Sequence, residues 1–229
     1  MTSCAGLRQR YRALYLPKAR VIKASSLSSR MERIIRVLAI GLGLVGLMLF
    51  SKGGYMQAKA HFAQFLIQRA WEQTLVDQMP HKPWEWADTY PVAKLALINE
   101  RDGHEMSTEL YVLAGVSGRS LAFGPGLVLA GANVGEVGNT IIAGHRDTHF
   151  AILNGVTKGR RLQLQTSDGR LKTYEVFQTH VVHGSDQRFM ARRPDERLTL
   201  ITCYPFDELG GGASLRFVVE AIPVPENLI

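Results

Sequence analysis

Cysteine is scarce in this 229-residue chain, which contains only Cys4 and Cys203. Two cysteines cannot form the framework of a disulfide-rich scaffold, and no closely spaced set of Cys and His residues resembles a zinc site. The sequence also lacks an acidic cluster of the kind that binds calcium. We therefore expect neither a metal ion nor another cofactor. A lone cysteine that works with a distant histidine is the pattern left open.

Acidic residues are nearly absent from the first 36 residues, which hold nine of the 27 Lys and Arg residues and one acid, Glu32. The other 193 residues carry 18 basic and 19 acidic side chains, so the net charge of +7 belongs to the N-terminal tail. A nucleic-acid-binding domain would carry basic residues on its own folded surface. The charge distribution therefore predicts no nucleic-acid partner.

Only one long hydrophobic run is present, IIRVLAIGLGLVGLMLF at 34–50. Its 17 residues would rise about 26 Å as a helix, slightly less than the thickness of a hydrocarbon core. The Lys and Arg excess before it predicts a cytoplasmic N-terminus. We expect a basic cytoplasmic tail at 1–33 and a single-pass anchor in the inner membrane at 34–54. The rest of the chain would then lie on the periplasmic, extracytoplasmic side.

A cleavable signal peptide is the alternative, with an apolar core at 37–50 and a small-residue site, AKA, at 58–60. An uncleaved anchor is favoured because residues 55–79 have apolar side chains at helical spacing and so run straight through that site. Pro80 is expected to end this helix.

The sequence pattern changes at residue 92. The preceding segment, 55–91, is predicted to form a juxtamembrane helix and a linker rich in Pro and Trp. Residues 92–229 show short β-like runs between Gly, Asp, Asn and Ser turns, with SDG at 167–169 the clearest hairpin signal. Short helical turns are expected at 120–123 and 149–153. Seven or more short strands predict one all-β domain, a barrel or a sandwich. The expected strands are 93–98, 110–113, 140–143, 161–165, 171–179, 198–202 and 215–222.

Three segments place a polar or reactive side chain at or near the end of a predicted strand. They are NTIIAGHRDTHF (139–150), TLITCYPFD (199–207) and SLRFVVEA (214–221). Taken singly, His145 suits a hydrogen-bonded turn, Cys203 a small buried hydrophobe, and Arg216 a solvated strand position. Taken together, they can meet at one edge of a sheet.

Such a meeting would have chemical consequences. A thiol with an ordinary pKa of about 8.5 is only a few per cent thiolate at neutral pH. A nearby imidazole can stabilise the thiolate and later protonate a departing amine. A guanidinium stays protonated and can stabilise an oxyanion or hold a substrate carbonyl. These are the parts that acyl transfer requires.

These segments resemble the active-site motifs of the sortase family. AGHRD contains His145, TLITC contains Cys203 and LRFVVEA contains Arg216, with separations of 58 and 13 residues that are typical of the family. The glycine-rich approach to the histidine also matches, and the resemblance covers about residues 90–222. TCYPFD and the Trp-rich linker are most similar to sortases of Gram-negative, proteobacterial type.

The resemblance implies a closed eight-stranded β-barrel and a cysteine transpeptidase. Such an enzyme cuts an LPxTG-like C-terminal sorting signal of a protein substrate, holds the acyl group as a thioester and passes it to an amine acceptor. It implies that Cys203 is the nucleophile, His145 the general acid and base, and Arg216 the residue that stabilises the oxyanion or orients the substrate. Thr202 and Tyr204 are expected to contact the substrate, although Thr202 equally suits a structural role and Tyr204 can simply end the strand.

Three other functions remain open at the level of sequence. The same scaffold can support a cysteine hydrolase in which water replaces the amine. A non-catalytic periplasmic β-domain would use the cysteine only for packing. An L,D-transpeptidase is disfavoured because its SHGC-type cysteine motif is absent.

Overall fold

The computed structural model describes residues 27–101, 104–207 and 214–225. Cys4 and most of the predicted cytoplasmic tail lie outside the described residues. The chain divides into two compact units, residues 1–54 and 55–229. The candidate chemistry lies wholly in the second unit.

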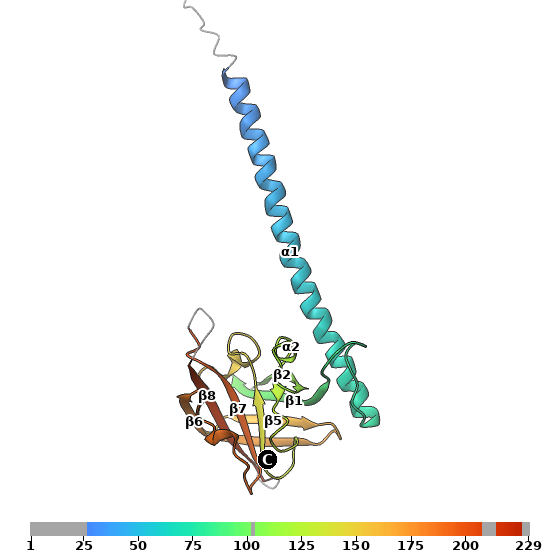
Figure 1. The fold of residues 1–229 in the computed structure, drawn as a ribbon, viewed down its shortest axis with the longest axis vertical. Helices are drawn as coiled ribbons and strands as arrows, with labels where there is room; N and C mark the ends of the chain where they lie inside the picture. Colours follow the sequence, from blue (N-terminus) through green and yellow to red (C-terminus); the bar gives the residue numbers. More distant parts are fainter. Residues whose placement is uncertain (1–26, 102–103, 208–213, 226–229) are drawn as a thin grey trace, which may run out of the picture. The chain divides into compact units, whose positions relative to one another are not determined.

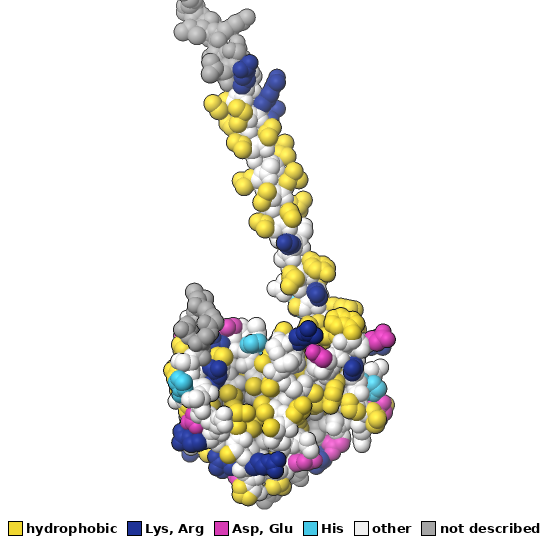
Figure 2. Space-filling model, in the orientation of Figure 1, with side chains coloured by type: hydrophobic (Ala, Val, Ile, Leu, Met, Phe, Trp, Pro, Cys, Tyr) yellow, Lys and Arg dark blue, Asp and Glu magenta, His cyan; other side chains and the backbone are white. Residues whose placement is uncertain are grey.

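The helix α1 spans Leu27–Asp77 and contributes to both units (Figure 1). In the first unit, the large apolar side chains between Met31 and Phe50 are 55–79% exposed. Figure 2 shows these side chains along the helix, after Lys and Arg side chains near its start. An 18-residue window of α1 has a mean hydropathy of 2.3. By length and composition the helix can cross a membrane, a property it shares with signal sequences.

The part of α1 in the second unit packs against the barrel through one face. Ile67, Ala70 and Trp71 are at most 2% exposed. The Gln64 side-chain amide donates to the Phe123 carbonyl at 2.6 Å. The segment from Tyr55 onward therefore belongs to the same compact unit as the strands.

The helix ends at Asp77, two residues before the predicted end at residue 79. Gln78 adopts a φ of 60°, the left-handed conformation that commonly terminates helices. Met79 precedes Pro80, and a residue before proline is disfavoured in the helical conformation. The Asp77 carboxylate accepts from the Met79 N–H at 2.9 Å and closes the turn.

Eight strands form a closed barrel, which confirms the predicted fold class. Every predicted strand is present, and the strands generally extend beyond the predicted bounds because pairing continues past the apolar core of each run. The strands are β1 (Pro91–Arg101), β2 (His104–Ala114), β3 (Gly126–Leu127), β4 (Asn139–Ala143), β5 (Arg161–Thr166), β6 (Leu171–His183), β7 (Arg197–Tyr204) and β8 (Leu215–Pro223).

The strand order around the barrel is β1-β2-β3-β4-β7-β8-β6-β5, and β5 pairs with β1 to close it. The pairs β2–β3 and β4–β7 are parallel, and the remaining pairs are antiparallel. Strands β5 to β8 are visible in Figure 1 as one curved wall. The parallel β4–β7 pair matters most for the candidate site, because it puts the carboxyl ends of both strands at the same edge.

The sequence did not predict β3, which has only two residues and therefore no readable periodicity. It bridges β2 and β4 through the pairs Leu113–Gly126 and Leu127–Ile142. A Cβ on Gly126 would lie 2.2 Å from the Gly115 carbonyl oxygen. Only glycine permits this close approach of two backbones.

Short helical segments lie between the strands. In the described part of the chain they are α2 (Gly118–Leu121), η1 (His149–Leu153) and η2 (Arg188–Met190). The turn predicted at 149–153 is found at those residues, and the turn predicted at 120–123 begins two residues earlier. That shift follows the cap, since the Ser117 hydroxyl accepts from the Ser120 N–H.

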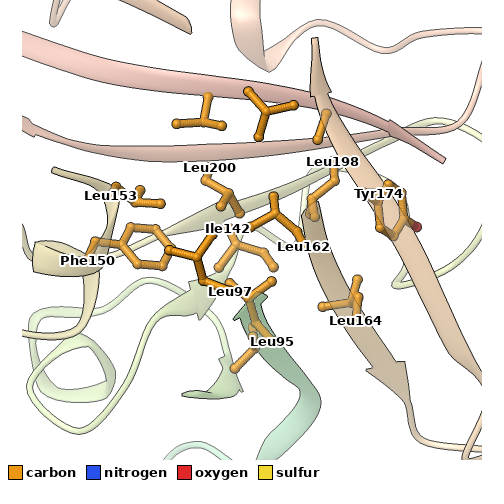
Figure 3. Packing of buried hydrophobic residues seen from close by; sticks show 14 of the residues in the cluster. Leu95, Leu97, Ile142, Phe150, Leu153, Leu162, Leu164, Tyr174, Leu198 and Leu200 are labelled. Carbon is orange, nitrogen blue, oxygen red and sulfur yellow. The ribbon is translucent and has the colours of Figure 1, made fainter. Parts of the chain in front are cut away.

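The barrel interior is filled by aliphatic and aromatic side chains from its strands and from η1 (Figure 3). Inward residues recur at every second position, as in Leu198 and Leu200 of β7. Phe150 of η1 lies among Ile142 and Leu153 and is fully buried. This core fixes the loop that precedes η1.

Candidate active site

Cys203 and Arg216 lie opposite each other on neighbouring strands. In the antiparallel β7–β8 pair, Cys203 is the register partner of Arg216. Residues that face each other in this way project from the same side of the sheet, with Cβ atoms roughly 4.5–5.5 Å apart. Leu198 and Leu200 point into the core, so alternation directs the Cys203 side chain to the outer face at the barrel rim. Its thiol is free and half-buried.

His145 reaches the same rim from β4. In the parallel β4–β7 pair, Ala143 lies beside Ile201. The pairing continues past the end of β4, since the Gly144 N–H donates to the Ile201 carbonyl at 3.1 Å. His145 follows Gly144 directly, and Thr202 and Cys203 follow Ile201 on β7. The structure therefore brings the three predicted catalytic residues to one edge of the barrel, with the His145 side chain exposed.

Arg216 is half-buried, and its guanidinium lies near Gly184, the residue after β6. Arg216 Nη1 donates to the Leu215 carbonyl at 2.9 Å. A Cβ on Gly184 would lie 3.5 Å from Arg216 Cζ and 3.1 Å from the Ser214 carbonyl oxygen. The absence of a side chain at residue 184 thus leaves the guanidinium room beside β6.

Thr202 is 2% exposed, and its hydroxyl donates to the Gly144 carbonyl at 2.8 Å. The hydroxyl therefore has a partner within the protein, next to the histidine. The predicted substrate contact of Thr202 stays a prediction, and the geometry favours a structural role in holding the loop that carries His145.

Tyr204, the residue after Cys203, belongs to a group of three aromatic rings. Its ring stacks on Phe217 at 6.2 Å between centroids and meets Phe206 edge-on at 6.1 Å. Phe206 and Phe217 are in turn 5.5 Å apart and pack against the core. The half-buried Tyr204 can offer an apolar surface to a substrate, and its substrate contact stays a prediction.

Sequence reasoning assigned no role to Arg146, which is only 4% exposed. Arg146 Nη1 donates to the Pro205 carbonyl at 2.6 Å, and Nε donates to Asp147 at 3.2 Å. A buried arginine is uncommon unless it is paired. The only feature of the sequence that points to a role for Arg146 is its position next to His145. An arginine in such a loop is equally compatible with a solvent-exposed side chain.

A second polar cluster, also missed, lies on the outer face of the barrel below the rim. Glu220 of β8 is 5% exposed and accepts from Arg197 at 3.3 Å and from His180 at 3.1 Å. Beside it, the Asn139 amide donates to the Phe189 carbonyl at 2.9 Å. The bond from Asn139 holds the β6–β7 connection against the outer face that Cys203 also occupies.

His149 lies on the other side of the histidine loop, beside an apolar cavity. The pKa of His149 is lowered, first because of burial and second because of the charge of His145. The cavity, about 570 Å³ in volume, also contacts Phe123 and the start of the second part of α1, at Met56.

The rim brings together three side chains with complementary chemistry. A thiol, an imidazole and a guanidinium at one edge can supply a nucleophile, a proton-transfer group and a fixed positive charge. Among the residues that the structure describes, no group of three or more His, Cys, Asp and Glu side chains could hold a metal ion.

Known proteins share this architecture. The family model of the sortase domain matches residues 104–224. Sortase D of Bacillus subtilis is 32% identical over 116 residues, which cover 50% of this chain and 58% of that protein. The match thus spans less than two thirds of that relative.

Solved structures give the same result. Sortase A from Corynebacterium diphtheriae is 26% identical with a TM-score of 0.51, covering 61% of this chain and 63% of that one. The Sortase D5 transpeptidase of Clostridium perfringens is 21% identical with a TM-score of 0.50, covering 67% of this chain and 88% of that one. At this identity the likeness supports the fold alone. With the domain match extending over more than half of the chain, from β2 to beyond β8, the protein belongs to the sortase family.

Proposed function

We propose that the protein is a membrane-anchored sortase that cleaves an LPxTG-like sorting signal between Thr and Gly and transfers the acyl group to an amine. The observation that carries the proposal is the cross-strand pairing of Cys203 with Arg216 beside the loop of His145. Membership of the sortase family supports the class of reaction.

In the first half-reaction, the Cys203 thiolate attacks the Thr carbonyl carbon, and a C–S bond forms. Arg216 stabilises the negative charge on the carbonyl oxygen or orients that carbonyl. The C–N bond to Gly then breaks, and His145 gives its proton to the departing amine. The product is a thioester on the enzyme.

In the second half-reaction, an acceptor amine attacks the thioester carbon. His145 takes a proton from the amine, the new C–N bond forms and the C–S bond breaks. Water can attack in place of the amine, which would make the protein a hydrolase. The aromatic side chains that follow Cys203, Tyr204 and Phe206, would provide an apolar wall for the sorting signal.

The proposed location is the inner membrane, with residues 34–54 as a single-pass anchor and the basic residues 1–33 in the cytoplasm. The second unit would then act on the periplasmic side, with 55–91 as the juxtamembrane segment and 92–229 as the catalytic barrel. The exposed apolar surface of α1 supports this arrangement. The proposal extends to the proteobacterial subtype, which rests on the motif TCYPFD and the Trp-rich linker.

The test uses the full chain in detergent with an LPxTG-containing peptide, with and without an added amine. Cys203→Ala should abolish cleavage and transfer, by at least about 10⁴-fold, whereas Cys4→Ser should retain both. Retained turnover by Cys203→Ala would end the nucleophile assignment. Cleavage that yields only the free acid, even with excess amine, would favour the hydrolase.

A further inference from the structure

Arg146 follows His145 directly in the chain, yet the two side chains have opposite environments. The imidazole is exposed, whereas Arg146 is 4% exposed. A guanidinium is rarely buried without specific partners, because desolvating a charge is costly. A partner that explains the burial is the Pro205 carbonyl, 2.6 Å from Nη1.

The bond to Pro205 acts together with two others that tie the two catalytic segments to each other. In one of them the Gly144 N–H donates to the Ile201 carbonyl, and in the other the Thr202 hydroxyl donates to the Gly144 carbonyl. The residues on both sides of the histidine are thus bonded to residues on both sides of the cysteine. The two Gly144 bonds lie at the sheet edge before the cysteine, and the Arg146 bond lies beyond it.

A second contact explains why arginine suits this position. Arg146 Nε donates to Asp147, whose side chain is 68% exposed. An exposed ion pair adds little stability by itself. A planar guanidinium can, however, donate in two fixed directions at once, so the pair with Asp147 orients the group that holds Pro205. The ammonium of lysine is a point charge without that fork.

We propose that Arg146 is a positioning residue, which fixes the separation of His145 from Cys203 by holding the chain at Pro205. The proposal rests on the proposed function for its kinetic consequences. Its action is indirect, because the guanidinium is directed to a backbone carbonyl and not to the reacting atoms. A displacement of about 1 Å in such a pair can reduce a rate by about 10²-fold.

The test compares Arg146→Met, Arg146→Lys and Arg170→Met, all in a Cys4→Ser background. Arg170 is the matched control, because it is also paired to a carboxylate but lies 65% exposed in the β5–β6 turn. We expect Arg146→Met to lower kcat about 10²-fold, with KM within about threefold. Arg146→Lys should have a kcat about tenfold higher than that of Arg146→Met, since lysine keeps the charge and one donor. Arg170→Met should stay within about twofold.

Thiol reactivity provides a readout that does not depend on turnover. The pH profile of Cys203 alkylation by iodoacetamide is measured in each variant with and without His145→Ala. In the parent protein the histidine should change the profile, and in Arg146→Met this effect should be lost. If the parent protein neither cleaves nor transfers, the proposed function fails, while the alkylation profiles still decide the role of Arg146.

Two outcomes would overturn the positioning role. One is a folded Arg146→Met protein with kcat and alkylation profile like those of the parent. The other is loss of the folded state in both Arg146 variants, as judged by circular dichroism and thermal melting. That result would assign the contact with Pro205 to stability.

Discussion

Gly144 tests directly how tightly the histidine loop is held, because alanine at this position has no room. A Cβ there would lie 2.8 Å from Cγ and from Cδ2 of Phe150. Unbonded carbons normally approach to about 3.5–4.0 Å, so about 0.7 Å of extra separation is required. Phe150 is fully buried among Ile142 and Leu153 and cannot yield (Figure 3).

The backbone at residue 144 must therefore move instead, and His145 moves with it. The shift strains the bonds of Gly144 to Ile201 and Thr202, now 3.1 Å and 2.8 Å long. Overpacking of this kind typically costs about 1–3 kcal/mol of unfolding free energy. A displaced imidazole should lower kcat by about 10²-fold.

The assay for Gly144→Ala combines peptide cleavage with thermal unfolding, and Gly118→Ala is the matched control. A Cβ on Gly118 meets no atom within 4 Å, so that variant should keep both its stability and its rate. The reasoning is refuted if Gly144→Ala loses stability yet retains kcat within about threefold, since the loop would then tolerate displacement.

Two further predictions concern the second unit. Trp71→Ala should destabilise it by about 3–5 kcal/mol in denaturant titrations, because Trp71 is 2% exposed against the barrel; Trp86→Ala, at an 82% exposed position, is the control, and equal effects would contradict the docking of α1. Burial and the charge of His145 lower the pKa of His149 in the folded protein. Below the ordinary histidine pKa of about 6.5, the unfolded chain therefore binds more protons than the folded one, and the free energy of unfolding should fall as the pH drops. His149→Gln should flatten this slope in melts between about pH 7.5 and 5.5, and parallel slopes in the two proteins would refute the argument.

The sequence predicted the barrel well because each strand carries its own local signal. The runs that became β4 and β7 are apolar and bounded by turn residues, and the motifs at their ends identify the family. Residues such as His145 and Cys203 could be predicted as candidate catalytic residues because they stand in motifs that resemble those of one family.

Other features depend on tertiary contacts that leave little local trace. Gly126 forms a strand only because the backbones of β2 and β4 pair with it on either side. Arg146 and Glu220 are charged residues in segments where solvation is the ordinary expectation. Each is buried against partners distant in sequence, Arg146 at Pro205 and Glu220 at His180 and Arg197. Neither burial can be read from the neighbours of the residue along the chain.

The register of β7 and β8 is the feature on which the whole site depends. Cys203 faces Arg216 because every pair from Leu198–Ala221 to Tyr204–Leu215 keeps the same offset. Side chains alternate between the two faces, so a slip of one residue would turn Arg216 toward the interior and Phe217 outward. The buried pairing of Leu198 with Ala221 opposes such a slip, because both side chains are fully buried in the core. The apolar core of the barrel therefore determines which face of the rim receives the guanidinium.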